Sequence, residues 1–401
     1  MGRTLIITND FPPRMGGIET FVYELASRLD PARVVVLTAS MPGADAVDRG
    51  LAFPVHRLRT STLLPVRQVR RAAEQLIERY GCDSVWFGAA APLGLLGSAL
   101  RANPQVKRVV ASTHGHERTW ARIPAGRVVL RRIAAGVDVL TYISEPVRAA
   151  LAAAIPHCPA RLVRLTPGVD LTKFSPADAA PGGGEVRGLQ QEAGANNPAT
   201  RPDPSSADAA PRVGEGAVVV CVARLVKLKG QDVLLRAWAR VAPHHPDATL
   251  LLVGGGPRRK ALQAEARRLG LDGSVHFTGP VPYSAIPDLY RAADVAALLT
   301  RPVAAGLVLE GLGAVTLEAS ACGVPVIVGR TGGAIETVRD GVTGYLVDPR
   351  DEVEVAGRIN ALLADRPAAQ AMGAAGREWM TQEWSWQDRA TQIAHLLTPT
   401  P

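Results

Sequence analysis

The feature that most constrains the fold is a repeated unit, in which a short apolar strand leads through a loop into apolar residues at helical spacing. The first unit starts with LIIT and passes through a loop containing Pro12, Pro13, Gly16 and Gly17. It then places apolar residues at positions 18, 21, 22, 25 and 29. Strands that alternate with helices in this way predict parallel sheets covered by helices.

This rhythm runs through VVVL, SVWFG, RVVAST and VLTYIS, stops, and starts again at AVVVCVAR. Between the two runs, residues 175–216 are rich in Ala, Pro, Gly, Asn and Asp and carry almost no large apolar side chains. Such a segment buries too little surface to offset the entropy of ordering, so we expect a flexible linker.

The chain of 401 residues is also longer than one hydrophobic core usually organises. We therefore predict an α/β protein with two Rossmann-like parallel-sheet domains that face a central cleft. The first domain spans residues 1–174 and the second spans 217–378. A final helix over 379–401 is expected to cross back to the first domain.

Composition narrows the class further. The four cysteines form no CxxC pair, so neither a disulfide framework nor a zinc site is predicted. The N-terminal segment leads directly into a predicted strand, and its apolar run is too short for a signal peptide. No uncharged stretch of the sequence is long enough to span a membrane. We expect a cytoplasmic protein.

The basic charge lies in the first half of the chain. Residues 1–170 carry 22 Lys and Arg against 13 Asp and Glu, although the whole chain has a net charge of only +8. The segments 65–80 and 118–137 combine arginines with an apolar face, which suits either an anionic lipid surface or a solvated helix face. Nucleic acid is not predicted as a partner, because no helix-turn-helix, RNP or zinc-finger pattern is found.

The second domain offers two cations directly after a strand. Arg224 follows AVVVCVA, and Lys229 comes five residues later, before a helical pattern. In open parallel sheets, ligands bind at the carboxyl ends of the strands, so these cations could neutralise a diphosphate leaving group. Ordinary surface salt bridges are the alternative. Gly254 and Gly255, after LLLV, suggest a close backbone approach, although without the complete dinucleotide fingerprint.

The most specific pattern is EGLGAVTLE, which places Glu310 and Glu318 eight positions apart. Glycines keep Glu310 in a loop, whereas the helical pattern after Gly313 begins with Ala314 and Val315 and has Glu318 about one turn inside. The helix start favours a diphosphate, and carboxylates accept hydrogen bonds from vicinal hydroxyls. Glu310 therefore suits a transferred sugar and Glu318 a ribose, while an exposed helix position remains the alternative for Glu318.

The first domain adds weaker candidates. Gly16 and Gly17 precede a helical pattern and could let a diphosphate approach the backbone, but a plain turn explains them equally well. His114 follows the strand VVAST and could donate to a sugar hydroxyl or stabilise positive charge at the anomeric carbon. His116 and Glu117 are its near competitors, and a structural histidine is the alternative.

With these residues in place, the chain resembles the retaining GT-B glycosyltransferases of family 4, and among them the PimB-type phosphatidylinositol mannosyltransferases of actinobacteria. The resemblance rests on TNDFPPRMGGIE, ASTHGHE, LTPGVD, ARLVKLKGQD, VGGGP and EGLGAVTLEASACGVPVI, and it covers nearly the whole chain except the linker.

The resemblance implies GDP-mannose as the donor, a phosphatidylinositol monomannoside as the acceptor, and a new α-1,6 bond. It places Gly17 at the diphosphate and acceptor, His114 and Glu310 at the donor sugar, Arg224 and Lys229 at the phosphates, and Glu318 at the ribose. Gly16, Gly254, Gly255, Val275, Gly313, Ala314 and Val315 are also expected to contact the donor. It further implies that the leaving phosphate deprotonates the acceptor, that no cofactor or metal is required, and that the protein sits peripherally on the inner face of the plasma membrane.

Other functions remain open on the sequence. A related transferase could use UDP-glucose or UDP-N-acetylglucosamine with a soluble acceptor such as inositol phosphate. A nucleotide-sugar epimerase or a pyridoxal-dependent phosphorylase could occupy the same scaffold, as could a non-catalytic nucleotide-sugar sensor.

Overall fold

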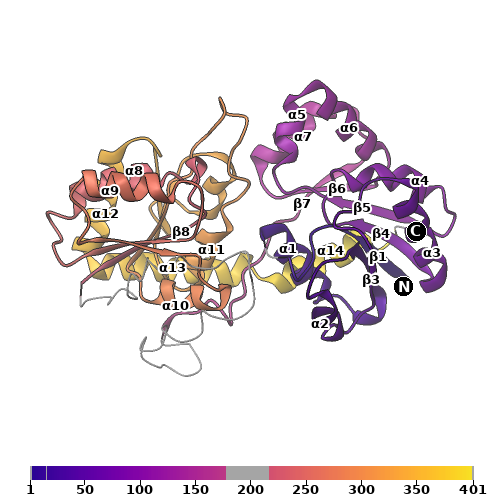
Figure 1. Ribbon diagram of the computed structural model, residues 1–401, viewed down its shortest axis with the longest axis horizontal. Coiled ribbons are helices and arrows are strands. Elements are labelled where there is room, and N and C mark those ends of the chain that lie inside the picture. Colours follow the sequence, from indigo (N-terminus) through magenta and orange to yellow (C-terminus); the bar gives the residue numbers. More distant parts are fainter. Residues whose placement is uncertain (1, 15, 178–215, 400–401) are drawn as a thin grey trace. The chain divides into compact units, whose positions relative to one another are not determined.

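The computed structural model describes residues 2–14, 16–177 and 216–399. It divides into two compact units, which we call unit 1 and unit 2 (Figure 1). Unit 1 comprises Met1–Gly168, Ala304–Leu312 and Trp384–Pro401, and unit 2 comprises Val169–Val303 and Gly313–Glu383. The predicted α/β class with two parallel sheets is confirmed. Almost all of the predicted linker, residues 178–215, lies outside the described residues.

Unit 1 is built on a seven-stranded parallel sheet with the order β3-β2-β1-β4-β5-β6-β7. Its strands are β1 (Arg3–Ile7), β2 (Val34–Ala39), β3 (Val55–Leu58), β4 (Cys82–Phe87), β5 (Arg108–Ser112), β6 (Val139–Tyr142) and β7 (Arg161–Arg164). Its helices are α1 (Gly17–Ala26), α2 (Ala44–Arg49), α3 (Arg67–Tyr80), α4 (Gly97–Arg101), α5 (Glu117–Arg122), α6 (Pro124–Ala135), α7 (Glu145–Ala154) and α14 (Trp386–Leu397), with short 3-10 turns η1 (Pro31–Arg33) and η2 (Leu93–Leu96).

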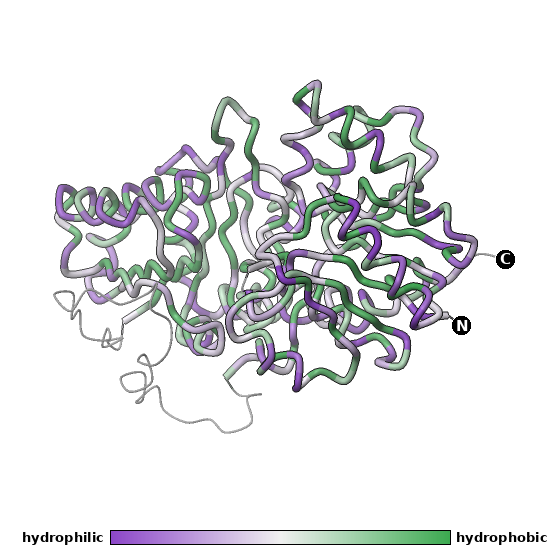
Figure 2. The backbone as a smooth tube through the Cα atoms, turned by 45° about the vertical axis from the view of Figure 1, so that its right-hand side comes forward, coloured by the Kyte–Doolittle hydropathy of each residue, from purple (hydrophilic) through white to green (hydrophobic). Residues whose placement is uncertain are grey.

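The C-terminal helix α14 is part of the unit 1 core. Trp386 packs edge-on against Phe21 of α1, with ring centroids 6.2 Å apart, and Ile393 is fully buried in the same cluster. Strand residues on this face, such as Ile6 and Trp86, complete the cluster. Figure 2 shows the same segregation, with hydrophobic strands inside and hydrophilic segments outside. Because this apolar surface needs a helix to cover it, α14 stabilises a sheet formed more than 200 residues earlier in the chain.

Unit 2 is built on a six-stranded parallel sheet with the order β10-β9-β8-β11-β12-β13. Its strands are β8 (Val218–Val222), β9 (Thr249–Val253), β10 (Val275–Gly279), β11 (Val295–Leu298), β12 (Val326–Gly329) and β13 (Gly344–Val347). Its helices are α8 (Gln231–Val241), α9 (Arg259–Arg268), α10 (Ile286–Arg291), α11 (Ala314–Ala321), α12 (Glu352–Ala364) and α13 (Arg366–Glu383), with 3-10 turns η4 (Lys227–Lys229), η5 (Tyr283–Ala285) and η6 (Gly332–Thr337).

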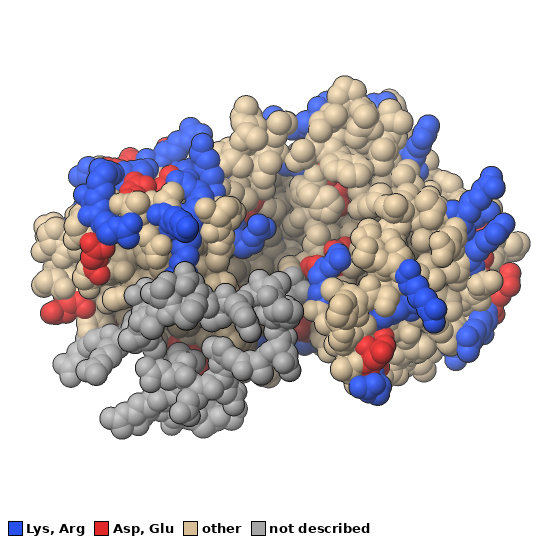
Figure 3. Space-filling model, in the orientation of Figure 1, with Lys and Arg blue, Asp and Glu red and all other residues tan. Residues whose placement is uncertain are grey.

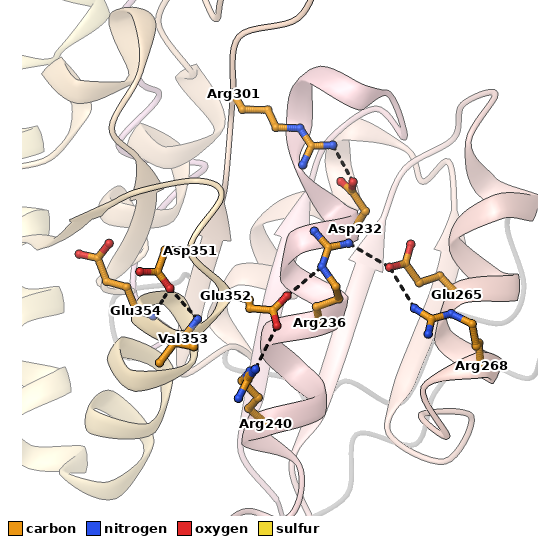
Figure 4. Close-up of polar contacts among 10 residues, drawn as sticks. All are labelled: Asp232, Arg236, Arg240, Glu265, Arg268, Arg301, Asp351, Glu352, Val353 and Glu354. Carbon is orange, nitrogen blue, oxygen red and sulfur yellow. Dashed lines mark hydrogen bonds and ion pairs between the residues drawn. The ribbon is translucent and has the colours of Figure 1, made fainter.

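Arginines on α8 tie that helix to its two neighbours on the same face of the sheet (Figure 4). Arg236 donates to Glu265 of α9 at 3.0 Å and to Glu352 of α12 at 2.9 Å, and Arg240 donates to Glu352 at 3.1 Å. These side chains are partly exposed, so solvent screens each pair and limits it to roughly 1 kcal/mol or less. The buried faces of the helices, rather than these ion pairs, hold unit 2 together.

The division into units differs from the sequence-based boundaries in three places. Unit 1 ends at Gly168 rather than at residue 174, and α13 continues in unit 2 to Glu383 rather than to residue 378. In addition, Ala304–Leu312 leaves the second domain's part of the sequence and packs with unit 1. A contiguous reading of composition and periodicity assigns neighbouring residues to one domain, so it cannot detect such an excursion.

We expect Ile393→Ala in α14 to lower the stability of unit 1 by about 2–4 kcal/mol, because it removes apolar volume from a packed core. Chemical denaturation of the whole chain, followed by a probe in unit 1, measures this change. Gln387→Ala, on the exposed side of the same helix, serves as the control and should leave the midpoint almost unchanged. Equal effects of the two changes would show that α14 does not complete the core.

Candidate functional site

In each unit the strand order reverses at one point, and the candidate residues other than Val275 lie on the carboxyl side of the sheets where this occurs. In unit 2 the chain runs from β8 to β9 and β10 on one side, then returns to place β11 on the other side of β8. In unit 1 the same change falls between β1 and β4. Loops diverge from the carboxyl ends of the strands at such a point and leave room for a ligand.

The segment after β8 holds Arg224 and Lys229 at this edge. Its backbone is fixed by the loop after β9: the N–H of Ala223 donates to the carbonyl of Val253 and the N–H of Leu225 to that of Gly255, both at 2.9 Å. Arg224 is exposed and Lys229 is half-buried. Both predicted cations therefore lie on one short, well-supported segment.

The charge of Lys229 acts on Cys221, near the end of β8. Burial raises the pKa of the Cys221 thiol to about 12, and the ammonium of Lys229 opposes that rise. The buried side chain of Gln231 supports the same segment, because its amide donates to the carbonyl of Arg224 at 3.0 Å.

The loops after β8 and β11 come into close contact at Gly230. Its φ is 71°, and a Cβ atom placed there would stand 2.0 Å from the carbonyl oxygen of Leu299. Arg301, in the loop after β11, donates its N–H to the carbonyl of Leu228 at 2.9 Å and its guanidinium to Asp232 at 2.6 Å (Figure 4). The position of Lys229 thus depends on a contact that only glycine permits.

Packing within unit 2 accounts for Gly254 and Gly255. The φ of Gly254 is 129°, and an added Cβ would lie 2.3 Å from the carbonyl oxygen of Ala223. Its N–H donates to the carbonyl of Gly279 at 2.9 Å, so it is not available to a diphosphate. An added Cβ on Gly255 would approach Pro280 to 2.9 Å. These glycines shape the edge of the sheet, and donor contact through them stays a prediction.

Helix α11 follows β11 and carries Glu318 one turn inside, as predicted. Gly313 precedes the helix with a φ of 84°, and its carbonyl accepts a hydrogen bond from the hydroxyl of Thr316 at 2.7 Å. Ala314, at the first position, is exposed and Val315 is half-buried. The start of α11 is therefore fixed at the carboxyl edge of the sheet.

Glu318 is half-buried and accepts a hydrogen bond from the hydroxyl of Tyr283, with 2.8 Å between the two oxygens. Burial raises the pKa of Glu318 to about 7, while the bond from Tyr283 and the charge of Lys173 lower it. This carboxylate lies on the same edge of the unit 2 sheet as Arg224 and Lys229.

In unit 1, His114 follows β5 and contacts the loop after β4. Its Nε2 lies 2.7 Å from the carbonyl oxygen of Gly88, so Nε2 carries the proton and donates it. Burial lowers the pKa of the imidazole, although the charge of Glu117 opposes this. A neutral ring whose single N–H is engaged accepts at Nδ1, so this geometry does not favour donation from His114 to a sugar hydroxyl. Stabilisation of positive charge at the anomeric carbon by His114 stays a prediction.

Glu117 is buried beneath the His114 loop. One of its oxygens accepts the N–H groups of His114 at 3.0 Å and Gly115 at 3.1 Å, and the other lies 3.2 Å from Nε2 of His116. Glu117 and His116, the competitors of His114 on the sequence, thus support its loop.

Glu310 lies in the part of the β11–α11 loop that packs with unit 1. The hydroxyl of Ser144 donates to the carbonyl of Gly311 at 2.8 Å, and the guanidiniums of Arg118 and Arg122 donate to the carbonyl of Gly306 at 3.2 and 2.6 Å. A Cβ atom on Gly311 would stand 3.0 Å from the carbonyl oxygen of His114. The segments carrying Glu310 and His114 are therefore neighbours.

Gly16 and Gly17 begin α1, after the loop that follows β1. Gly16 is the N-cap, and its carbonyl accepts the N–H of Thr20 at 3.0 Å. Gly17 is exposed, and an added Cβ would meet nothing within 4 Å. Packing inside the protein does not require glycine at position 17, which leaves its predicted ligand contact open.

Val275 is misplaced as a donor-binding residue. It is the first residue of β10, pairs with Leu250 and is buried in the unit 2 core. The site residues lie beyond the opposite, carboxyl ends of the strands. Gly279, not Val275, is the residue of β10 at that end.

Sequence reasoning missed three supporting residues: Tyr283, Gln231 and Ser144. Tyr283 and Ser144 act on groups that are 35 and 167 residues away in the sequence, so no local spacing reveals them. Gln231 acts on the carbonyl of Arg224, and this contact depends on the turn η4 between the two residues. Within the described ranges, no three His, Cys, Asp or Glu side chains are gathered so that they could hold a metal ion. A search of the same residues finds no helix with the length and apolar character that a membrane crossing needs.

Two family profiles match the chain. The profile of glycosyltransferase family 4 covers residues 15–173, and that of the glycosyl transferases group 1 covers residues 205–379. In solved structures, the chain is similar to Anabaena HepE in complex with UDP and glucose, with a TM-score of 0.75, 22% identity and coverage of 98% of this chain and 99% of that one. Sucrose-phosphate synthase from Thermosynechococcus elongatus gives a TM-score of 0.72 at 21% identity, covering 98% of each chain. These structures support the fold alone.

Relatives found by sequence are more similar to this chain than these solved structures are. The GDP-mannose-dependent alpha-(1-6)-phosphatidylinositol monomannoside mannosyltransferase of Mycobacterium tuberculosis is 42% identical over 99% of this chain and 98% of that protein. The GDP-mannose-dependent monoacylated alpha-(1-6)-phosphatidylinositol monomannoside mannosyltransferase of Corynebacterium glutamicum is 39% identical over 100% of this chain and 98% of that protein. The D-inositol 3-phosphate glycosyltransferase of Kribbella flavida is 34% identical over 60% of this chain and 52% of that protein.

We expect Gly230→Ala to lower the stability of unit 2 far more than Gly270→Ala does. Both glycines have a φ of 71°, but a Cβ on Gly270 meets nothing within 4 Å. Gly270→Ala should therefore lose only the free energy that a left-handed conformation costs alanine, about 1–2 kcal/mol. Gly230→Ala should lose the same amount and, in addition, the cost of the clash with Leu299. Thermal or chemical denaturation compares the two, and equal losses would contradict the proposed contact between the loops.

Proposed function

Since the chain belongs to the family of GDP-mannose-dependent α-(1-6)-phosphatidylinositol monomannoside mannosyltransferases, we infer that it transfers mannose from GDP-mannose to a phosphatidylinositol monomannoside. It is a hexosyltransferase with two Rossmann-like domains of the GT-B type, and it forms an α-1,6 bond with retention. The observation that carries this conclusion is 42% identity along 99% of the chain, since it extends over both sheets and over every loop that carries a candidate residue.

We propose that the donor is gripped by charge at one end and by carboxylates at its hydroxyls. Arg224 and Lys229 would neutralise the diphosphate as it leaves, and Glu318 would accept hydrogen bonds from the ribose. Glu310 would do the same for the mannose hydroxyls. Supporting this assignment, Arg224, Lys229 and Glu318 follow the two strands on either side of the switch point in unit 2.

His114 and Gly17 would act from unit 1. A neutral His114 presents Nδ1 as an acceptor, which suits a hydroxyl of the transferred sugar. Gly17 offers an exposed backbone at the start of α1 for the diphosphate and the acceptor. The leaving phosphate would take the proton of the attacking hydroxyl, and the two cations would supply the positive charge without a metal ion.

Radiolabelled GDP-mannose incubated with purified protein and phosphatidylinositol monomannoside tests the assignment. Label should move into a lipid that migrates as the dimannoside. Folded protein that leaves the lipid unlabelled would contradict the proposed function, and conversion of a UDP-sugar without any acceptor would point instead to an epimerase.

A second candidate is a transferase with a UDP-sugar donor and inositol phosphate as a soluble acceptor. It is favoured by the 34% identity to the D-inositol 3-phosphate glycosyltransferase of Kribbella flavida, although that match covers only 60% of this chain. Calorimetric comparison of GDP with UDP separates the two candidates, because the first requires tighter binding of GDP.

We expect Lys229→Ala to raise the KM for GDP-mannose and to slow transfer, with a loss of about ten- to hundredfold in kcat/KM. The reason is the removal of a charge-assisted contact of about 1.5–3 kcal/mol. Lys227→Ala, an exposed lysine of the same turn η4, is the matched control and should retain activity. Steady-state kinetics checks both, and wild-type values for Lys229→Ala would refute its role at the phosphates.

We also propose that the protein works at the inner face of the plasma membrane through unit 1. On α6, Ile123 at its start and Val128 each keep 47% of their surface exposed, beside the exposed side chains of Arg131 and Arg132. Lys and Arg also gather over α8 and α9 of unit 2, but Asp and Glu lie among them (Figure 3). Apolar groups next to basic side chains favour anionic lipid.

Replacing Val128 and Arg132 with Ser should reduce binding to phosphatidylglycerol vesicles while sparing GDP affinity. The lost arginine alone accounts for about 1 kcal/mol. Arg127 and Arg131 are left in place because they donate to the carbonyls of Ala121 and Ala154. Arg267→Ser in unit 2 is the control, and a vesicle-sedimentation assay that does not distinguish the two variants would contradict the lipid contact.

A further inference from the structure

Tyr283 contacts Glu318, the residue proposed to bind the ribose, but the proposed function gives Tyr283 itself no role. It begins η5, after β10, and keeps 39% of its surface exposed. Its hydroxyl donates to one carboxylate oxygen of Glu318 at 2.8 Å. A neutral phenol that donates to a carboxylate orients it and leaves its other lone pairs for further donors.

Lys173 holds Tyr283 from the other side. Its ammonium lies 3.5 Å from the centroid of the Tyr283 ring, a distance at which cation and ring attract each other. The ring of Phe174 also packs on Tyr283, with centroids 5.7 Å apart. Lys173, Tyr283 and Glu318 therefore form a line of contacts that ends on the carboxylate.

The backbone that carries Lys173 is fixed to unit 2 by two arginines. Arg291 of α10 donates to the carbonyls of Lys173 and Ser175, both at 2.9 Å. Arg377 of α13 donates to the carbonyl of Phe174 at 2.7 Å. The ammonium thus projects from an anchored segment rather than from a free surface turn.

We propose that Tyr283 and Lys173 are positioning residues that hold the Glu318 carboxylate ready to accept the ribose hydroxyls of the donor nucleotide. This inference rests on the proposed function and extends it to two residues that no motif of the sequence identified. Neither residue needs to touch the nucleotide. Their effect on binding passes through Glu318.

The groups around Glu318 determine the expected pH dependence. Burial raises its pKa to about 7, and the Tyr283 bond and the Lys173 charge are the two influences that lower it. Tyr290 of α10 and Cys322, which directly follows α11, face the same carboxylate, and burial keeps both of them neutral at this pH. On α10 and α13, Arg291 and Arg377 lie near Cys322, and both are engaged with backbone carbonyls.

The direction of the pH dependence follows because the ionised carboxylate accepts hydrogen bonds from hydroxyls better than the neutral form does. Above the pKa the carboxylate binds ribose fully, and below it the affinity falls. Removing either Tyr283 or Lys173 removes a group that lowers the pKa, so the loss of affinity should begin at a higher pH. A purely structural change would weaken binding by the same factor at every pH.

Calorimetric titration of the full-length protein with GDP, between about pH 5.5 and 8.5, tests this directly. Tyr283→Phe and Lys173→Gln should each weaken GDP binding at pH 7 by about three- to tenfold, since the lost group contacts an ionised carboxylate or its partner. In both variants the inflection should move to higher pH. Lys173→Arg should restore most of the affinity, because it keeps the cation over the ring.

Tyr345→Phe, on β13 of the same unit, is the matched control and should behave as wild type. With 2′,3′-dideoxyguanosine diphosphate, the wild-type protein should bind more weakly and the two variants should no longer differ from it. The terminal phosphate of the ligand also titrates in this range, but its contribution cancels when variants are compared at one pH.

Unshifted inflections in both variants, or a difference from wild type that persists with the dideoxy ligand, would overturn the inference. That result is distinct from failure of the proposed function, in which the wild-type protein itself would not bind GDP.

Discussion

Parallel strand pairing is the constraint on which the rest of the structure depends. Because all strands of each sheet run the same way, their carboxyl ends meet at one edge, and the loops that leave the strands on either side of the switch point diverge there. In unit 2 this brings Arg224 and Lys229, after β8, to the same edge as α11, which follows β11. The cations and the carboxylate are more than 80 residues apart in the sequence, and the topology alone brings them together.

Burial shifts the pKa values of two candidate residues in opposite directions. It raises the pKa of Glu318 and lowers that of His114, so in both cases it favours the neutral form. Around Glu318 the protein opposes burial with a phenol and an ammonium, which favours the charged acceptor. Around His114 the ring N–H donates to the carbonyl of Gly88, which suits a neutral acceptor. The chain thus contains both a carboxylate whose ionised form is favoured by its neighbours and an uncharged imidazole, and either can accept a hydrogen bond from a hydroxyl.

Periodicity was sufficient to predict both sheets and the helix that carries Glu318, since these depend on local patterns. It failed where the outcome depends on tertiary contacts. Val275 lies at the wrong end of its strand, and the single N–H of His114 is already engaged. The excursion of Ala304–Leu312 and the role of Tyr283, which is 35 residues from Glu318, leave no trace in local spacing. The roles of the site residues toward the donor stay predictions.

The structure of the lipid product tests the central claim most directly. Purified protein supplied with GDP-mannose and phosphatidylinositol monomannoside should yield enough dimannoside for nuclear magnetic resonance of the new sugar linkage. The account requires an α-configured mannose at the 6-hydroxyl of the acceptor mannose, because an acceptor hydroxyl that gives its proton to the leaving phosphate attacks from the face on which that phosphate departs. A β-configured mannose, or attachment at another hydroxyl, would contradict it.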